Sequence, residues 1–455
     1  MIVVRERKNN NELYFETEIL EGNKSVCTNT TYYKSLIKEI NATTYLMLYD
    51  STMKPISEVF AFLNYNKVSQ SLNSKIKALS ALKLLYSFQS IINKELKDFN
   101  TIDINSLKLF LKGLSPKGQV MTFELSSSRN NQTINGYLSI YRQYLEYIGI
   151  ENKALLTKNN IKALITFLDS ETYFSVERYK SNEKIPRKPV EVPRYISFDK
   201  FRSIIEEIRA NYGMVEEIIV RLMYQCGLRI GECLGLTADD LVIEKVGDIY
   251  VPMAYIRNRV CDKNDQQAKT CMVVIDKKQY RSKEYKTEGY GYQKVIVPQD
   301  LFDLINGYIE EAHIKARKQK KDNYYSKTIA DRVRSEEPHE DVNYYVFLNT
   351  LGKPLLSHLW NQRVRAIFKT VGIAVDKVVR EHNLNHRFRH GFAMFNVQHL
   401  GCKEIELMQR MRHSSLASIS FYFKPTLSDQ IKIKTDFADS LYALIPDLKL
   451  KGSYS

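Results

Sequence analysis

The chain has 455 residues, of which 44% are hydrophobic and 26% are charged, so about two or three domains with ordinary cores are expected. Its formal net charge of +15 favours an anionic partner, most commonly nucleic acid. No run of about 18 apolar residues occurs and charges follow directly after Val4, so neither a membrane span nor a signal peptide is expected. Six scattered cysteines without a CxxC pair, and histidines without close ligand spacing, predict no disulfide, no metal and no cofactor in a reducing cytoplasm.

Residues 1–55 have the least regular pattern of the chain. Leu13–Ile19 is typical of a strand, Tyr32–Ile40 predicts a short helix, and Met53–Pro55 indicates a break. We expect this segment to form an N-terminal accessory module or an extended arm.

From residue 56 to residue 165 the pattern becomes helical. Apolar side chains recur at spacings of three and four within Leu72–Tyr86 and within Ile134–Ile148. Ile104–Leu111 predicts a shorter helix, which Asp103 is expected to cap. Residues 56–165 are therefore predicted to form a small all-α domain with lysines and arginines on its polar faces.

A basic, proline-containing stretch, residues 166–196, is predicted to be the linker to the next domain. Its prolines keep such a segment extended. Basic side chains here and on the polar helix faces could either contact a DNA backbone or only be solvated. The candidates for DNA contact are Lys75, Lys77, Arg187, Lys188 and Arg194.

Residues 197–430 are predicted to form a mixed α/β domain, beginning with a helix that Ser197 caps. The predicted helices are Phe198–Ala210, Glu216–Cys226, Asp300–Arg317 and one ending at Phe368. The predicted strands are Tyr250–Val251, Met272–Ile275 and Lys294–Pro298. Lys318–Pro338 is expected to be an exposed insertion, and residues 431–455 form a C-terminal tail with helical apolar spacing.

The stretch from His386 to Tyr422 carries groups that could attack a phosphodiester. Such an attack needs a nucleophile, positive charge beside the non-bridging oxygens and a proton for the leaving oxygen. The planar fork of arginine binds two oxygens and stays charged, and nearby cations favour the phenolate of tyrosine. A phosphotyrosine keeps the energy of the broken bond, so rejoining the strand needs no ATP.

Three motifs occur in order, namely GLRIGE at 227–232, HRFRH at 386–390, and His413 followed nine residues later by Tyr422. Together they resemble the tyrosine recombinase (phage integrase) family, over roughly residues 60–430. The resemblance implies a multidomain protein with an all-α, SAM-like core-binding domain and a mixed α/β tyrosine-recombinase catalytic domain.

The resemblance also implies which residues would bind the scissile phosphate. Arg229 and Arg389 would bind it and stabilise the transition state, and His413 would contact a non-bridging oxygen. Glu232 resembles the acidic residue that supports the site, and it lies three positions after Arg229 on the same helix face.

Two further roles concern the nucleophile and the protons. Tyr422 would form the 3′-phosphotyrosyl bond and free a 5′-hydroxyl, while His386 would hydrogen-bond the phosphate and assist proton transfer to or from Tyr422. In the family, a lysine on a β-hairpin protonates the leaving 5′-oxygen. Lys286, which precedes a glycine-containing turn, is the predicted residue, and Lys269 is its rival.

Several neighbouring residues are expected to be structural or depart from the family pattern. His390 is expected to pack, and Asp239–Asp240 to cap a helix rather than bind a metal. Arg412 replaces the usual glycine before the third-motif histidine, and Gly391 stands where threonine is common. The long separation of the motifs predicts an insertion within 255–345.

The resemblance implies a site-specific recombinase that cuts and rejoins double-stranded DNA through a phosphotyrosyl intermediate and a Holliday junction, to integrate or excise a mobile element. It would act without metal or ATP as a homotetramer on two sites, with accessory DNA-bending or directionality proteins. The tail after residue 431 would pack on a neighbouring protomer or on its own domain. We expect a cytoplasmic protein that joins the nucleoid on DNA. The alternatives are a topoisomerase IB-like relaxing enzyme and a non-catalytic DNA-binding regulator.

Overall fold

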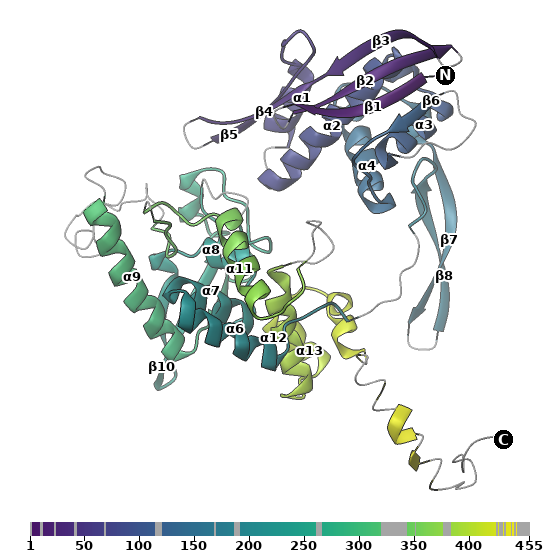
Figure 1. Ribbon diagram of the computed structural model, residues 1–455. Coiled ribbons are helices and arrows are strands. Elements are labelled where there is room, and N and C mark those ends of the chain that lie inside the picture. Colours follow the sequence, from purple (N-terminus) through teal and green to yellow (C-terminus); the bar gives the residue numbers. More distant parts are fainter. Residues whose placement is uncertain are drawn as a thin grey trace, which may run out of the picture. The chain divides into compact units, whose positions relative to one another are not determined.

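The computed structural model describes residues 2–9, 12–21, 24–40, 43–67, 70–113, 121–167, 170–185, 192–260, 266–319, 344–350, 352–375 and 384–424, with scattered positions from 426 to 443. The chain divides into two compact units, Met1–Arg187 and Lys188–Ser455 (Figure 1). No helix within these ranges is both long and apolar enough to cross a membrane. Arg187, Lys188, most of the predicted insertion and most of the C-terminal tail lie outside the described residues.

The first unit contains two small sheets near its N-terminus. One has the order β3-β2-β1-β6 and is antiparallel except for the parallel pair β1 and β6, and the other pairs β4 with β5. The strands are β1 (Ile2–Asn9), β2 (Glu12–Glu21), β3 (Lys24–Tyr32), β4 (Lys34–Ile40), β5 (Thr43–Tyr49) and β6 (Met121–Glu124). The helix predicted over Tyr32–Ile40 is therefore wrong. So short a segment is marginal as a helix, whereas β5 pairs with it along its whole length.

The prediction that residues 56–165 are all-α is wrong, because this range includes β6 and one strand of a hairpin. Helices make up most of the remainder of this unit, as the apolar spacing predicts. They are α1 (Ser57–Ala61), α2 (Leu72–Ile92), α3 (Thr101–Lys112), α4 (Asn131–Tyr147) and α5 (Lys153–Leu156). Asn100, not Asp103, is the N-cap of α3, because its side chain accepts hydrogen bonds from the amides of Ile102 and Asp103. Asp103 instead accepts from the Asn100 amide, which completes a capping box.

The N-terminal strands share one hydrophobic core with these helices. Val4, Phe15 and Leu46 are buried together with side chains of α2, α3 and α4, such as Leu82 and Phe110. Two short sheets cannot bury their apolar faces alone, and the helices supply the cover. Strands β1, β2 and β5 therefore contribute to this core, and they do not form a separate arm.

A long hairpin replaces the first part of the predicted linker. Strands β7 (Lys158–Phe167) and β8 (Ser170–Tyr179) pair antiparallel over their full length (Figure 1). The prediction of an extended linker from residue 166 is wrong for these residues. The prolines begin only at Pro186, and the aromatic and β-branched residues of β8 favour a strand.

The second unit is a mixed α/β domain with one three-stranded antiparallel sheet of order β11-β10-β9. The strands are β9 (Leu241–Val246), β10 (Ile249–Arg257) and β11 (Tyr292–Ile296). The helices are α6 (Phe198–Asn211), α7 (Met214–Gln225), α8 (Ile230–Leu234), α9 (Gln299–Gln319), α11 (Ser357–Thr370), α12 (His386–Gln398) and α13 (Glu404–Arg410). Leu222, Trp360 and Phe388 are fully buried in the core that joins α7, α11 and α12.

One predicted strand of this domain is wrong. Met272–Ile275 has no regular structure, although it is apolar and β-branched. The Asn258 side-chain amide donates hydrogen bonds to the carbonyl oxygens of Ala268, Cys271 and Met272, and the Met272 amide donates to Tyr290. These hydrogen bonds take the place of the backbone hydrogen bonds that a neighbouring strand would provide. The segment is therefore an irregular loop after β10.

Candidate active site

Three segments of the second unit converge on one buried cluster. They are the turn from Gly227 to Arg229 between α7 and α8, the first two turns of α12, and the stretch from Met411 to Tyr422 after α13. α12 packs directly against α7 and against the 3-10 turn that carries Tyr422. The three motifs of the sequence are thus neighbours in space.

Arg389, on α12, links the three segments through hydrogen bonds. Its side chain is 2% exposed, and its two terminal nitrogens donate hydrogen bonds to the carbonyl oxygens of Gly227 and Met411. Burial lowers the pKa of Arg389 to about 9, which still leaves the guanidinium charged at neutral pH. A fixed buried cation is therefore built into this point of the fold.

Glu232 binds two further arginines. Its Oε1 lies 2.7 Å from Nη1 of Arg229, and its Oε2 accepts from the Arg229 amide at 2.9 Å and from Nη2 of Arg412 at 2.5 Å. Burial alone would raise the pKa of this carboxyl group, but the charges of Arg412, Arg389 and Arg229 hold it at about 2. Glu232 is therefore ionised, and it orients both guanidinium groups.

Local packing explains one of the two departures from the family pattern, and the other has an unusual backbone conformation. A Cβ at Gly391 would lie 2.5 Å from both the Ile196 carbonyl oxygen and the Tyr224 ring, so only glycine fits there. Arg412 has a φ of 54°, a left-handed conformation that glycine adopts freely and arginine rarely. The arginine with this strained backbone forms an ion pair with Glu232.

His386 and His413 face the same cations from two segments. Burial and the charges of Arg389 and Arg229 lower the pKa of each to about 4. Nδ1 of His413 lies 2.7 Å from the Ser418 hydroxyl, which donates its only hydrogen to the Ser415 carbonyl oxygen. Nδ1 of His413 must therefore be the donor, and its Nε2 is left to meet a ligand.

Tyr422 is 2% exposed, and its hydroxyl oxygen lies 2.5 Å from Nδ1 of His390. Burial raises the pKa of Tyr422, and the charges of Arg389 and Arg229 oppose that rise. His390, which the sequence predicts to be structural, also contacts the predicted nucleophile through this ring nitrogen. The spacing held the signal: His386 and His390 are four positions apart, hence on one face of a helix, and their rings lie 6.0 Å apart.

The predicted lysine is not on a paired strand. Lys286 is exposed in a turn after the 3-10 helix Lys277–Arg281. Its rival Lys269 is also exposed, and its charge is among those that lower the pKa of His386. Lys269 is thus near the cluster, whereas no described contact joins Lys286 to it.

The other candidates lie apart from this cluster. Lys77 is exposed on α2, and burial lowers the pKa of its neighbour Lys75, while Arg194 is exposed just before α6. Asp240 accepts hydrogen bonds from the amide and hydroxyl of Thr237, which confirms a capping role, and it also pairs with Arg257 at 2.8 Å.

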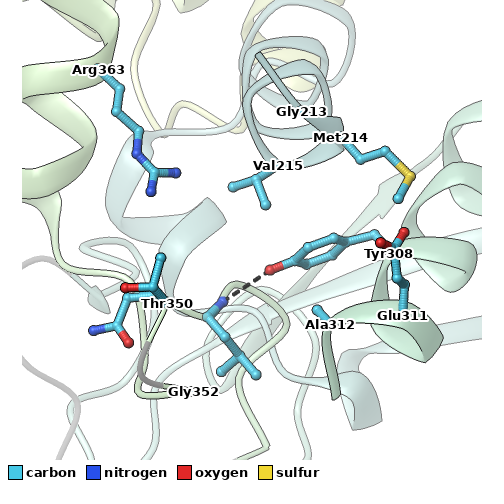
Figure 2. A pocket seen from close by; sticks show the side chains of 11 residues that line it. Gly213, Met214, Val215, Tyr308, Glu311, Ala312, Thr350, Gly352 and Arg363 are labelled. Atoms are coloured by element: carbon cyan, nitrogen blue, oxygen red, sulfur yellow. Dashed lines mark hydrogen bonds between the residues drawn. The ribbon is translucent and has the colours of Figure 1, made fainter. Parts of the chain in front are cut away.

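A cavity of about 510 Å³ opens between α7, α9 and the loop before α11. Figure 2 shows Tyr308 and Arg363 on its walls, with the Tyr308 hydroxyl accepting a hydrogen bond from the Leu348 amide at 3.2 Å. None of the cluster residues lines this cavity. The cluster is therefore a separate site, formed by side chains that are already in contact.

A buried tyrosine beside fixed arginines and neutral histidines defines a domain equipped to bind and attack an oxyanion such as a phosphodiester. The sequence model of the phage integrase family matches residues 194–428, more than half of the chain, and the chain belongs to this family. The helical content and mixed sheets fit a tyrosine recombinase fold.

Known proteins with partial similarity include Transposase A from transposon Tn554 of Staphylococcus aureus, which is 27% identical over 201 residues. That match covers 44% of this chain and 54% of the transposase, so the chain spans about half the length of the curated relatives it matches.

Solved structures that align over most of the chain include a XerH recombinase and the Tn1549 transposon integrase. The XerH recombinase in a post-cleavage complex on a palindromic difH substrate is 14% identical, with a TM-score of 0.46 over 84% of this chain and 95% of that one. The Tn1549 transposon integrase with transposon right end DNA is 16% identical, with a TM-score of 0.46 over 84% of this chain and 98% of that one.

Proposed function

We propose that the chain is a site-specific DNA recombinase of integrase or transposase type, which cuts and rejoins DNA to integrate or excise a mobile element. The observation that carries this proposal is the Tyr422 hydroxyl, held in a cluster with Arg389, Arg229 and their histidine neighbours. Family membership and the partial similarity to Transposase A support the same function.

The arginines would bind the scissile phosphate. Arg389 is fixed by two carbonyl oxygens and Arg229 by Glu232, so their charges are in place before DNA arrives. Such preorganised charge stabilises a transition state without the cost of reorganisation. His413 would donate from Nε2 to a non-bridging oxygen as an imidazolium, a state that the negative phosphate itself favours.

Tyr422 would be the nucleophile. Its hydroxyl oxygen bonds to phosphorus, the bond from phosphorus to the 5′-oxygen breaks, and that oxygen takes a proton and leaves as a 5′-hydroxyl. His386 would hydrogen-bond the phosphate. Lys269 or Lys286 would supply the proton, and the position of Lys269 near His386 favours Lys269. The reverse reaction restores the strand without ATP or metal.

The first unit would be the core-binding domain, and both units would contact the DNA backbone through basic side chains that include Lys75, Lys77 and Arg194. Arg187 and Lys188 of the predicted linker are further candidates for such contacts. A homotetramer on two sites would exchange strands through a Holliday junction, with the tail after residue 431 packed on a neighbouring protomer. Accessory DNA-bending or directionality proteins would choose the direction. The net charge of +15 supports a DNA partner.

The test is a library of nicked duplexes of random sequence, from which covalent protein–DNA adducts are recovered under denaturing conditions. The wild-type protein should enrich one sequence, and Tyr422→Phe should abolish the adduct while it retains binding. Tyr195→Phe is the matched control, because Tyr195 packs against the same apolar cluster as Tyr422. An adduct in the Tyr422→Phe variant would refute this nucleophile. Relaxation of plasmids without a preferred sequence would indicate a topoisomerase instead.

A further inference from the structure

The hydrogen bond between His390 and Tyr422 has a geometry suited to proton transfer. Nδ1 and the hydroxyl oxygen are 2.5 Å apart, so the base and the proton that it would accept are in direct hydrogen-bond contact, with no intervening group. Tyr422 is packed among apolar side chains such as Met394, Leu407 and Ile419, so its hydroxyl group has little access to water as a proton acceptor. The imidazole nitrogen is the acceptor that the fold provides.

Nδ1 of His390 can accept this proton. A neutral imidazole has one nitrogen with a free lone pair, and the tautomer with hydrogen on Nε2 presents that lone pair at Nδ1. Burial is the main cause that lowers the pKa of His390 to about 3, and the positive charges of protonated His386, of Arg389 and of protonated His413 add to it. The ring is therefore neutral in the DNA-free protein. A phosphate bound to the same cations would add negative charge nearby and make the ring more basic.

We propose that His390 is a catalytic residue, the base that accepts the phenolic proton of Tyr422 during strand cleavage. This inference rests on the recombinase function proposed above. As the tyrosine oxygen bonds to phosphorus, its hydrogen moves to Nδ1 of His390. The electron pair of the broken bond stays on the 5′-oxygen, which is protonated by a lysine. During rejoining, the 5′-hydroxyl gives its proton to that lysine and His390 returns its proton to the departing tyrosine oxygen.

His386, in contrast, would act on the phosphate. The two histidines lie on one face of α12, but the hydrogen bond to Tyr422 is made by the second of them. Substitution of each should therefore have a different signature. His386 variants should weaken phosphate contacts, whereas His390 variants should slow proton removal from a nucleophile that is still in place.

The first test measures single-turnover adduct formation on the duplex sequence recovered from the library. The variant His390→Asn can keep a hydrogen bond to Tyr422 but cannot take its proton, so cleavage should slow by roughly 100-fold or more at unchanged DNA affinity. His390→Ala should be slow as well, and added imidazole should restore its rate in proportion to concentration. His399→Asn, at the exposed end of the same helix, should cleave at the wild-type rate.

A second measurement needs no substitution. The ring ¹⁵N chemical shifts of His390 should show hydrogen on Nε2 and an accepting Nδ1. The opposite tautomer would overturn the proposal, as would a His390→Asn rate within about threefold of wild type or a His390→Ala variant that cleaves faster than wild type. A wild-type protein that forms no adduct with any library member would instead refute the recombinase function itself.

Discussion

Arg412 and Glu232, 180 positions apart in the chain, form an ion pair in which Nη2 lies 2.5 Å from Oε2. The same carboxylate holds the guanidinium of Arg229 at 2.7 Å. The arginine that replaces a glycine in the third motif is therefore linked through one carboxylate to the arginine of the first motif. Two buried nitrogens of Arg412, Nε and Nη1, have no hydrogen-bond partner among the described residues, so this ion pair is its principal polar contact.

The first prediction concerns this link. Arg412→Gly should raise the pKa of Glu232, because the variant lacks the Arg412 charge, the largest of the effects that lower this pKa. Relief of the left-handed backbone offsets part of the lost ion pair, so unfolding in urea should show a net loss of about 1–3 kcal/mol. As the pH is lowered, protonation of Glu232 should stop cleavage at a higher pH in Arg412→Gly than in the wild type. The variant Arg412→Lys should be intermediate. A wild-type pH profile in Arg412→Gly would contradict the link.

The second prediction assigns the proton donor. The acid that protonates a leaving oxygen becomes unnecessary when that oxygen is replaced by sulfur, which leaves readily as a thiolate. We therefore expect the Lys269→Ala variant to cleave a normal strand roughly 100-fold or more slowly than the wild type. The same variant should cleave a 5′-thio strand at nearly the wild-type rate. Lys286→Ala should affect both strands little. The reverse result would assign the role to Lys286, as the sequence suggests.

The third prediction concerns the glycine behind the second motif. Gly391→Ala should destabilise the second unit by about 1–3 kcal/mol, since the new methyl group collides with the Ile196 carbonyl oxygen and the Tyr224 ring. Gly307→Ala is the control: nothing lies within 4 Å of its Cβ, and it sits inside helix α9, so it should stabilise by about 0.5–1 kcal/mol. Urea midpoints that are equal for the two variants would contradict this packing.

The fourth prediction is a loss of stability in mild acid. His386, His390 and His413 have pKa values of about 4, 3 and 4 in the folded chain, against 6.5 in an unfolded one. Between these values the unfolded state binds more protons, so the free energy of unfolding must fall as pH decreases from 6.5. His413→Gln should flatten this dependence, measured by urea unfolding at pH 7 and pH 5. His399→Gln should leave it unchanged, and an equal slope in all three proteins would contradict the prediction.

Local pattern in the sequence was sufficient for the long helices and for the chemical groups. The three-and-four spacing predicted α2 and α4, and the Ser197 cap predicted the start of α6. Those features depend on neighbours within a few positions, which the sequence displays directly. The three sequence motifs contain Arg229, Arg389 and Tyr422, and in the structure these residues lie in one cluster.

Contacts between distant segments decided the rest. Strand β4 depends on pairing with β5, and the loop at Met272 depends on the side chain of Asn258, so their local composition was misleading.

The pairs Arg412–Glu232 and His390–Tyr422 are likewise made by side chains from separate segments. Residue types and spacing determined which chemistry the chain carries. Only tertiary packing decided which of several histidines and lysines reaches the nucleophile and the phosphate site, because hydrogen bonding and charge interaction depend on distances that one-dimensional order does not encode.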